Sequence, residues 1–360
     1  MENAIDCTKN SEDIMTTMQD VAKKARVSIT TVSRVLNGDA RVKADTRSRV
    51  ERVMASMGYQ PNLMARALRQ QSSRVIGLVV DTLKNPFTAE LSQGVADHLD
   101  ATGYQLILAD TQRQSQKGPR LLQMLAQRGV DGILYAAGWE TDADSLTVEC
   151  RIIQRNQIPT VIVGNALPTV TSVSIDHRQG IRDALTHLYG LGHRHVAFVS
   201  GAGETETTRL RRQGFVDTAK ALGLRMNSVY ASHGSLRAAT TVVDTILQNA
   251  PGTTAIVAAS DYIAVGILHG LFTKAYQVPR DISVIGFDNV QISQFLCPAL
   301  TTIDADIPQL ASAACERLYS LITDPALSVD PLVLVPQLVR RQSTGVPRSR
   351  DAGPDNKRVD

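Results

Sequence analysis

A short stretch near the N-terminus places hydrogen-bonding side chains at the start of an amphipathic helix. In MQDVAKKARVSITTVSRVLNG, apolar spacing predicts a helix over Met18–Ala25, and Ser28 is suited to cap a second helix over Ile29–Leu36. The side chains left outside on or beside this second helix are Ile29, Thr30, Thr31, Ser33, Arg34 and Asn37. A helix in the major groove of DNA reads base edges with its N-terminal residues, while nearby polar groups hold phosphates. The pattern therefore predicts DNA recognition, with two ordinary helices bearing a solvated basic face as the alternative.

The charge distribution marks the same end of the chain. Residues 16–74 carry 12 of the 38 Lys and Arg residues but only four of the 35 Asp and Glu residues. The remaining residues are acidic on balance, although the whole chain has a net charge of +3. This asymmetry is expected when one small domain meets a polyanion and the rest of the protein does not.

A second group of residues with chemical potential follows apolar runs further along the chain. The residues at the ends of these predicted strands are Asp81, Gly164, Asp261 and Asp288. The runs themselves cover 75–80, 105–109, 132–137, 160–163, 195–200, 254–259 and 283–287, and helical patterns lie between them. A new series begins at 173–176, so we expect two doubly wound parallel-sheet lobes of the α/β class. In such sheets ligands bind beyond the carboxyl ends of the strands.

Length and composition suggest how these parts are divided. A chain of 360 residues exceeds one typical domain, and 43% hydrophobic residues with a single Trp favour aliphatic, buried strands. An all-α head therefore precedes a two-lobed α/β sensor. The expected divisions are a disordered extension 1–15, a helix-turn-helix domain 16–61, a linker segment 62–73, a ligand-binding domain 74–345 and a disordered tail 346–360. Lobe 1 is expected to cover about 74–175 and 303–335, and lobe 2 about 176–302 and 336–345.

Cysteines and hydropathy bear on the compartment. Cys7, Cys150, Cys297 and Cys315 are far apart and form no CxxC pair, so we expect reduced thiols. The polar N-terminus has no apolar signal region, and no stretch approaches 18 uninterrupted apolar residues. We therefore expect a cytoplasmic protein without a membrane association.

The chain resembles the lactose/galactose repressor family of transcription regulators over nearly its whole length. The N-terminal resemblance is carried by Val27, Ser28, 31–37, Thr46, Val50, Gly58, Tyr59, Pro61, Asn62, Ala65, Arg66, Leu68, Ser73, Ile76 and Gly77. Further motifs are RGVDGIL, GHRHVAFVSG, SDYIAVGIL, VPRDISVIGFDN and PALTTI. A departure is Arg26, which stands where many relatives have Gly in the turn. The resemblance implies a sensor with the fold of periplasmic sugar-binding proteins and a homodimer on a pseudo-palindromic DNA operator.

The resemblance also assigns roles in DNA binding. Base-reading positions fall on Ile29, Thr30 and Arg34, and backbone-contact positions on Thr17, Ser28, Ser33 and Asn37. Residues 62–69, beginning at Asn62, match a hinge helix that folds on the operator. Within it Leu68 takes the position of a minor-groove wedge, and Arg69 that of a minor-groove or phosphate contact. An ordinary linker leucine is the alternative for Leu68.

For the small-molecule effector, the resemblance places Arg211 in a ligand-clamping position. Its planar donor fork suits hydroxyls or a carboxylate, and Asp288 accepts hydrogen bonds from ligand groups. We expect these two residues of lobe 2, with Asp261, to face Asp81 and Thr88 of lobe 1 across one cleft. A surface salt bridge is the alternative for Arg211, and an interlobe structural carboxylate for Asp288.

Departures from the family narrow the chemical class of the expected effector. The residues concerned are Thr88, Gly164, Ser235 and Ser260, which replace aromatic, Asp or Asn side chains of some relatives. The small polar lining disfavours a purine and favours a sugar, sugar acid or sugar phosphate.

Other function classes fit the sequence less well. An enzyme is disfavoured because GxGxxG, GxxxxGK[ST] and GxSxG motifs are missing, and no cofactor is expected. A periplasmic binding protein has no use for a basic helical head. His193 and His195 could suggest a metal, but few further ligands lie nearby, so loop packing is the preferred interpretation. Activation or repression, and release or promotion of DNA binding by the effector, stay open.

Overall fold

The chain forms two compact units, 1–73 and 74–360. The computed structural model describes residues 16–36, 38–59, 72–114, 116–137, 149, 151–153, 155–164, 170–201, 205–231, 235–324, 327 and 330–348. Several expectations lie outside these residues. They concern Asn37, Asn62, Leu68, Arg69, the hinge 62–69, the extension 1–15 and the tail from 349 onward.

Within the described residues of the first unit, three helices form the head. Its helices are α1 (Met18–Ala25), α2 (Ile29–Leu36) and α3 (Ala44–Ser56). The first two have the bounds that the apolar spacing predicts. Their core consists of Val21, Ala22, Ala25, Val32, Val35 and Val50. Because so few apolar side chains are buried, the core contributes little free energy of folding. Hydrogen bonds that cap the helix ends therefore matter for the stability of the head.

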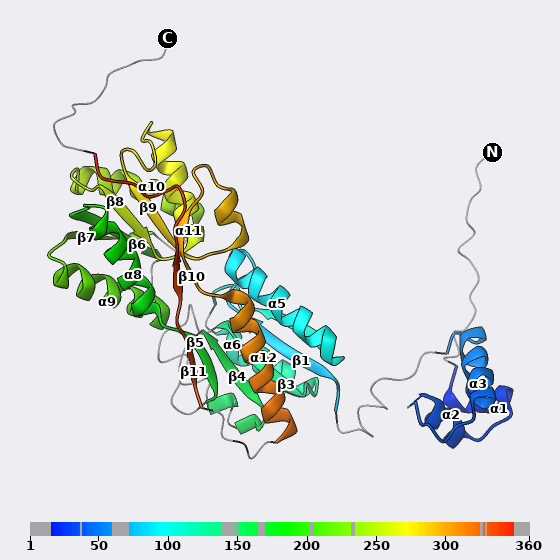
Figure 1. Cartoon of the computed structure of the whole chain (residues 1–360). Coiled ribbons are helices and arrows are strands. Elements are labelled where there is room, and N and C mark those ends of the chain that lie inside the picture. Colours follow the sequence, from blue (N-terminus) through cyan, green and yellow to red (C-terminus); the bar gives the residue numbers. More distant parts are fainter. Residues whose placement is uncertain are drawn as a thin grey trace, which may run out of the picture. The chain divides into compact units, whose positions relative to one another are not determined.

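Lobe 1 of the second unit is a six-stranded parallel sheet in the order β11-β5-β4-β3-β1-β2. Its strands are β1 (Val75–Val80), β2 (Gln105–Asp110), β3 (Gly132–Tyr135), β4 (Thr160–Gly164), β5 (Ser172–Ile175) and β11 (Leu332–Leu334). Helices α5 (Pro86–Thr102), α6 (Lys117–Gln127) and α12 (Ile307–Thr323) cover it, with α5 and α12 side by side (Figure 1). The run VIGLVV of β1 is apolar because both of its faces are covered.

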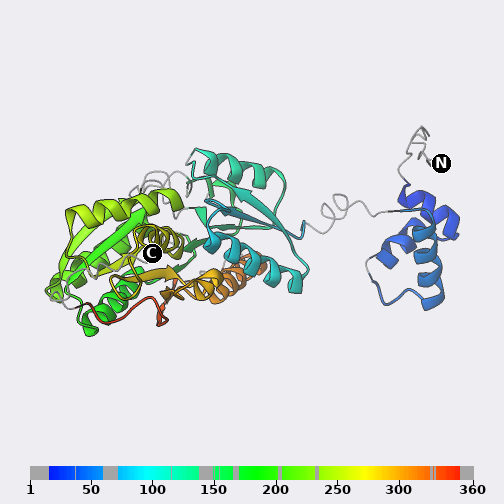
Figure 2. The same ribbon diagram turned by 90° about the horizontal axis from the view of Figure 1, so that it is seen from above.

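Lobe 2 has a similar sheet with the strand order β12-β10-β9-β8-β6-β7, in which the edge strand β12 runs antiparallel to β10 and the other pairs are parallel. The strands are β6 (His195–Gly201), β7 (Arg225–Ala231), β8 (Ala255–Ala258), β9 (Ser283–Asp288), β10 (Thr301–Asp304) and β12 (Gln337–Val339). The helices are α8 (His177–Gly190), α9 (Glu206–Ala221), α10 (Leu236–Asn249), α11 (Asp261–Thr273) and the short η3 (Gln291–Phe295). Figure 2 shows the helices of both lobes lying on either face of their sheets. The expected α/β class with two doubly wound lobes is confirmed.

Strand β10 pairs with β9 as far as Asp304, and the chain then passes to α12 of lobe 1. Residues 346–348, expected to open a disordered tail, lie against lobe 2, because Arg348 Nη1 donates to Asp281 Oδ1 at 3.2 Å. The prediction of disorder rested on the polar, proline-containing composition of this segment. Composition does not reveal a contact with a partner that is distant in the sequence.

Candidate DNA-binding head and effector cleft

The turn between α1 and α2 is set by local hydrogen bonds. Thr17 and Asp20 form a capping box at the start of α1, with Thr17 N donating to Asp20 Oδ2 at 2.9 Å. These hydrogen bonds from Thr17 lower the pKa of Asp20. Arg26 ends the helix in the left-handed conformation with φ 53° and ψ 48°. This geometry explains why glycine suits the position, since a Cβ costs free energy there.

The start of α2 presents its side chains to solvent. Ser28 Oγ accepts a hydrogen bond from Thr31 N at 3.1 Å, as expected of a capping residue. Ile29 is 44% exposed, an unusual environment for an isoleucine, and Thr30 beside it is exposed as well. Ser33 is half-buried. The surface is therefore open to a partner at the N-terminal end of α2.

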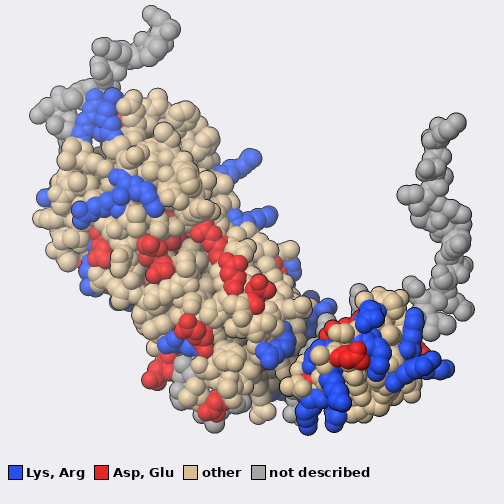
Figure 3. Space-filling view, turned by 45° about the vertical axis from the view of Figure 1, so that its right-hand side comes forward, with Lys and Arg blue, Asp and Glu red and all other residues tan. Residues whose placement is uncertain are grey.

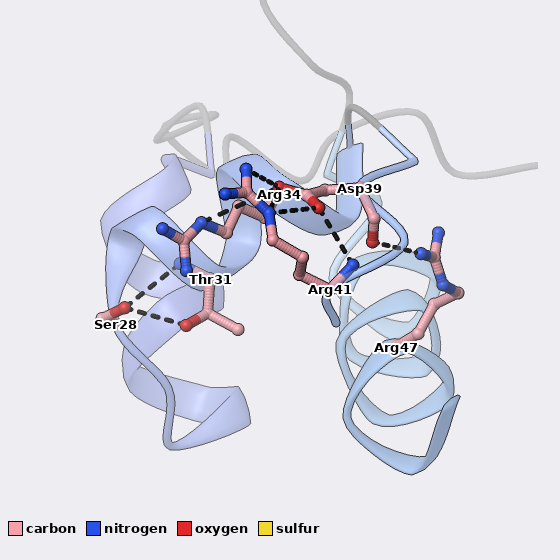
Figure 4. A network of polar contacts seen from close by, with 6 residues as sticks. All are labelled: Ser28, Thr31, Arg34, Asp39, Arg41 and Arg47. Atoms are coloured by element: carbon pink, nitrogen blue, oxygen red, sulfur yellow. Dashed lines mark hydrogen bonds and ion pairs between the residues drawn. The ribbon is translucent and has the colours of Figure 1, made fainter. Parts of the chain in front are cut away.

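A cluster of charges follows the end of α2 (Figure 4). Arg41 Nη2 donates to Asp39 Oδ2 at 2.8 Å, and this hydrogen bonding lowers the pKa of Asp39 to about 2. Arg34 Nε lies 3.9 Å from the same carboxylate, and its side chain is half exposed. Arg47 Nη2 donates to the Asp39 carbonyl oxygen at 2.8 Å. Sequence patterning missed Arg41 and Arg47, because their shared partner is a loop residue outside the helical motif.

The surface of the head carries many Lys and Arg side chains in one view, with few acidic ones among them (Figure 3). In the same view the second unit is mostly uncharged, with scattered residues of both signs. The basic surplus of residues 16–74 is therefore displayed at the surface, where a polyanion is attracted to it.

A cleft lies between the two lobes of the second unit. Its walls include Asn85 and Arg113 from lobe 1, which follow β1 and β2, and Arg211 and Asp288 from lobe 2. The remaining lining residues are Gly201, Thr205, Thr207, Thr208, Ala259, Ser260, Tyr262 and Ile263. The cleft is therefore at the carboxyl ends of the strands, where doubly wound sheets bind ligands.

Arg211 is held on α9 by partners on all sides. Its Nε donates to His177 Nδ1 at 3.3 Å, its Nη1 donates to the Ala259 carbonyl oxygen, and its Nη2 donates to Asp288 Oδ1 at 3.2 Å. The guanidinium carbon lies 3.7 Å from the centre of the Phe287 ring, a cation–π contact. Burial lowers the pKa of His177 well below its usual value, so the imidazole is neutral and Nδ1 can accept.

Asp288 completes the lobe 2 wall of the cleft. Burial raises the pKa of its carboxyl group to about 8, while the neighbouring Arg211 acts in the opposite direction. Its backbone has φ 115°, and the following Asn289 has φ 57°. Consecutive residues with positive φ store strain, which is found at ligand-binding sites.

Asp81 and Thr88 lie behind the lobe 1 wall rather than on it. Thr88 Oγ1 donates to Asp81 Oδ1 at 3.0 Å, and burial raises the pKa of Asp81. Arg113 Nε is 3.9 Å from Asp81 Oδ2, and Arg113 lines the cleft. The backbone of Arg113 has a positive φ of 59°. Sequence patterning missed Arg113, because it lies in a turn three residues beyond β2 rather than at the strand end.

Asp261 is not part of the cleft lining. Its side chain is fully buried and accepts from Val290 N at 3.0 Å, Ser293 Oγ at 2.5 Å and Thr302 Oγ1 at 2.5 Å. Burial raises the pKa of its carboxyl group to about 6 despite these donors. Asp261 therefore ties α11 to the segments that follow β9.

His193 is one of the two histidines that could suggest a metal site in the sequence. His193 is buried, with Nδ1 2.9 Å from Thr254 Oγ1 and Nε2 2.8 Å from the Gly345 carbonyl oxygen. Among the residues that the structure describes, no group of three or more His, Cys, Asp or Glu side chains is placed to hold a metal ion. Within the same residues no helix is long and apolar enough to cross a membrane.

Comparison with known proteins decides the class. Residues 17–62 match the family of bacterial regulatory proteins of the lacI type, and residues 185–344 match a periplasmic binding protein-like domain. The HTH-type transcriptional regulator DegA of Bacillus subtilis (strain 168) is 33% identical over 334 residues, which cover 91% of this chain and 98% of DegA. The chain belongs to the lacI family of bacterial regulatory proteins. This lacI-family protein is a DNA-binding transcription regulator and not an enzyme.

Two further comparisons support the same class of protein. The ribose operon repressor of Escherichia coli (strain K12) is 33% identical to the regulator over 91% of this chain and 100% of its own. A crystal structure of the lac repressor dimer bound to operator and the anti-inducer ONPF superposes with a TM-score of 0.83 at 26% identity, covering 92% of this chain and 99% of that one. The basic head excludes the alternative of a periplasmic binding protein, because it belongs to the DNA-binding family.

Proposed function

We propose that the regulator is a homodimeric repressor that binds a pseudo-palindromic operator through α2 and responds to a small polar effector bound between its lobes. The observation that carries this proposal is the exposed, polar start of α2 on a basic head. One such head buries little surface, and two-fold symmetry doubles the number of base contacts. Similar proteins named as repressors support repression. A regulator of this kind works where the chromosome is, in the cytoplasm.

In this proposal Ile29, Thr30 and Arg34 contact base edges. The exposure of all three supports this role, and Arg34 has to leave the neighbourhood of Asp39 to reach a base. The phosphate contacts come from Thr17, Ser28, Ser33 and Asn37, the last of which rests on the family resemblance alone. The hinge contacts of Asn62, Leu68 and Arg69 follow from the family resemblance alone.

The proposed effector is a sugar, sugar acid or sugar phosphate. Arg211 and Asp288 offer a donor fork and an acceptor to hydroxyl groups, and hydroxyls of Thr207, Thr208 and Ser260 line the same cleft. The N-terminal residues of α9 and α11 are among this lining, and helix N-termini favour an acidic group. Asp81 and Thr88 act one step away, by holding Arg113 against the cleft.

The cleft must widen to admit such an effector. Its free volume is about 60 Å³, whereas pockets for small organic ligands usually measure about 300 to 1,000 Å³. Glu90 on α5 bridges the lobes, since its Oε1 accepts from Gln291 N at 2.8 Å. Opening the lobes would break this hydrogen bond. Effector binding therefore changes the equilibrium between lobe angles. By thermodynamic linkage, a change in that equilibrium also changes the affinity for the operator.

One experiment tests both halves of the proposal. Purified protein is used to select binding sites from random duplex DNA, and the selected site is titrated with and without each member of a panel of sugars, sugar acids and sugar phosphates. We expect an inverted repeat occupied by two chains, and at least one compound that changes the dissociation constant. Selection of a single half-site by a monomer would refute the dimer. A purine that changes operator affinity where every sugar derivative fails would refute the effector class.

A further inference from the structure

A second cavity lies in lobe 1, at the opposite end of the sheet from the effector cleft. It has a volume of about 280 Å³ and is enclosed between α5 and α12. Ile76, near the start of β1, and Tyr104, just before β2, form part of its wall. The effector cleft instead contains Asn85 and Arg113, which follow the ends of the same two strands. The two sites are therefore separated by the length of the sheet.

The interior of this cavity is apolar. Its walls are formed mainly by Ile76, Leu99, Leu318, Ile322 and the rings of Tyr104 and Tyr319, with Cys315 between them. The half-buried His98 is a polar member of the same lining. Burial raises the pKa of the Cys315 thiol to about 12, so the thiol stays protonated and behaves as a small apolar group. A cavity of this kind offers van der Waals contacts mainly to carbon atoms. A charged ligand would therefore recover little of the hydration free energy that it loses on entering.

Polar groups occur at the mouth. Thr102 on α5 is exposed there, and Glu316 and Ser320 on α12 lie opposite. Glu316 disfavours an anion by its charge. The Thr102 and Ser320 hydroxyls donate to the Leu99 and Glu316 carbonyl oxygens, so their oxygens are left to accept a hydrogen bond from one polar substituent. Ligand sites commonly combine an apolar body with a few polar groups that fix orientation.

We propose that this cavity binds a small, neutral, mainly apolar ring compound, independently of the effector cleft. The volume is close to the lower limit for sites that take small organic ligands. Filling the cavity restores the dispersion contacts that its lining residues otherwise lack. The site therefore gives the regulator a second small-molecule input of different chemistry from the first.

The neutral dye N-phenyl-1-naphthylamine tests this proposal, because its fluorescence rises in an apolar environment. The full chain is titrated with the dye, and the dissociation constant is compared with those of T102F and S320F, which fill the mouth from opposite helices. We expect each substitution to weaken binding at least about tenfold, which corresponds to about 1.4 kcal/mol. A101F is the matched control, because Ala101 is exposed on the same turn of α5 and does not line the cavity.

Two further measurements keep the outcome decisive. C315M fills the cavity from its interior and should weaken dye binding in the same way, and thermal melting establishes that each variant is folded. R211K alters the effector cleft and should leave dye binding unchanged. Equal dye affinity in wild type, T102F, S320F and C315M would overturn the proposal. Loss of dye binding in R211K to the same extent would overturn it as well, because the dye would then occupy the cleft.

Discussion

Arg211 Nη2 lies 3.2 Å from Asp288 Oδ1, and both side chains are only 4% exposed. The pair therefore rules out the surface salt bridge considered for Arg211 from the sequence. Both residues belong to lobe 2, so Asp288 is not an interlobe tie through this contact either. Burial raises the pKa of the Asp288 carboxyl group to about 8, so near neutral pH Arg211 donates to a largely protonated carboxyl group. Removing either partner leaves the other buried polar group without this hydrogen bond. The pair also lines the cleft, where an effector can share its donors and acceptor.

Arg211→Lys should weaken effector binding while leaving operator binding without effector near normal. Lysine keeps the positive charge but lacks the planar fork that contacts three partners. We expect a loss of about 1.5 to 3 kcal/mol, or roughly 10- to 150-fold in the dissociation constant. Calorimetry with the compound identified from the panel measures this change. Unaltered effector affinity, or loss of operator binding in a folded variant, would contradict the assignment.

Asp288→Asn should flatten the dependence of stability on pH between about 4 and 8. The pKa of Asp288 is raised from 3.8 to about 8, so between these values the folded state holds a proton that the unfolded state releases. The free energy of unfolding therefore falls as pH rises towards 8 and levels off above it. Asparagine does not titrate. Urea denaturation at several pH values compares the two proteins, and parallel profiles would refute this prediction.

Asp261→Asn should destabilise the second unit by about 1 to 3 kcal/mol. The carboxylate accepts hydrogen bonds at both oxygens, from Thr302 at Oδ1 and from Val290 N and Ser293 at Oδ2. An amide nitrogen at the Oδ2 position would face the Val290 N–H, which can only donate, so the amide nitrogen belongs at the Oδ1 position, where the Thr302 hydroxyl can turn to accept. The cost then comes from replacing charge-assisted hydrogen bonds by weaker neutral ones. Denaturation monitored by circular dichroism measures the cost. Since Asp261 does not line the cleft, effector affinity of the folded variant should match that of the wild type.

Combined Ile29→Ala and Thr30→Ala should change which base pairs are preferred. Each base-specific interaction that the substitutions remove should cost about 1 to 3 kcal/mol of operator binding. Both side chains are exposed, so the helical head keeps its core and its non-specific affinity. Repeating the selection from random DNA with the double variant measures the effect. The proposed role of α2 would not survive recovery of the wild-type sequence with unchanged affinity.

Arg26→Gly should stabilise the head by about 1 kcal/mol, because the residue adopts φ 53° at the end of α1. The gain is limited by the greater backbone freedom of glycine in the unfolded state. Thermal denaturation of the full chain, followed in the transition of the head, provides the measurement. Arg26→Ala serves as the control, since it removes the guanidinium but keeps the Cβ. A comparable gain for alanine would assign the effect to the charge instead.

The sequence by itself determined the local elements and the class of the protein. Apolar spacing and the capping residue Ser28 set the bounds of α1 and α2, because helix ends depend on nearby residues. The run of β1 was predicted with its bounds, since a strand buried on both faces is apolar throughout. Strands β7, β10, β11 and β12 were not recognised. RMNSVYA of β7 and TTID of β10 mix polar and apolar residues, and three residues in β11 and β12 carry too little periodicity to stand out.

The tertiary structure decided which strand-end residues meet in the cleft. Asp261 and Asp288 look alike in the sequence, as acidic residues that follow apolar runs, yet Asp261 is enclosed by donors while Asp288 reaches the cleft. Arg113 became visible because the fold of lobe 1 brings its turn beside Asp81, 32 positions earlier. Burial and long-range contacts fix the role of a polar side chain, and neither depends on its immediate neighbours in the chain.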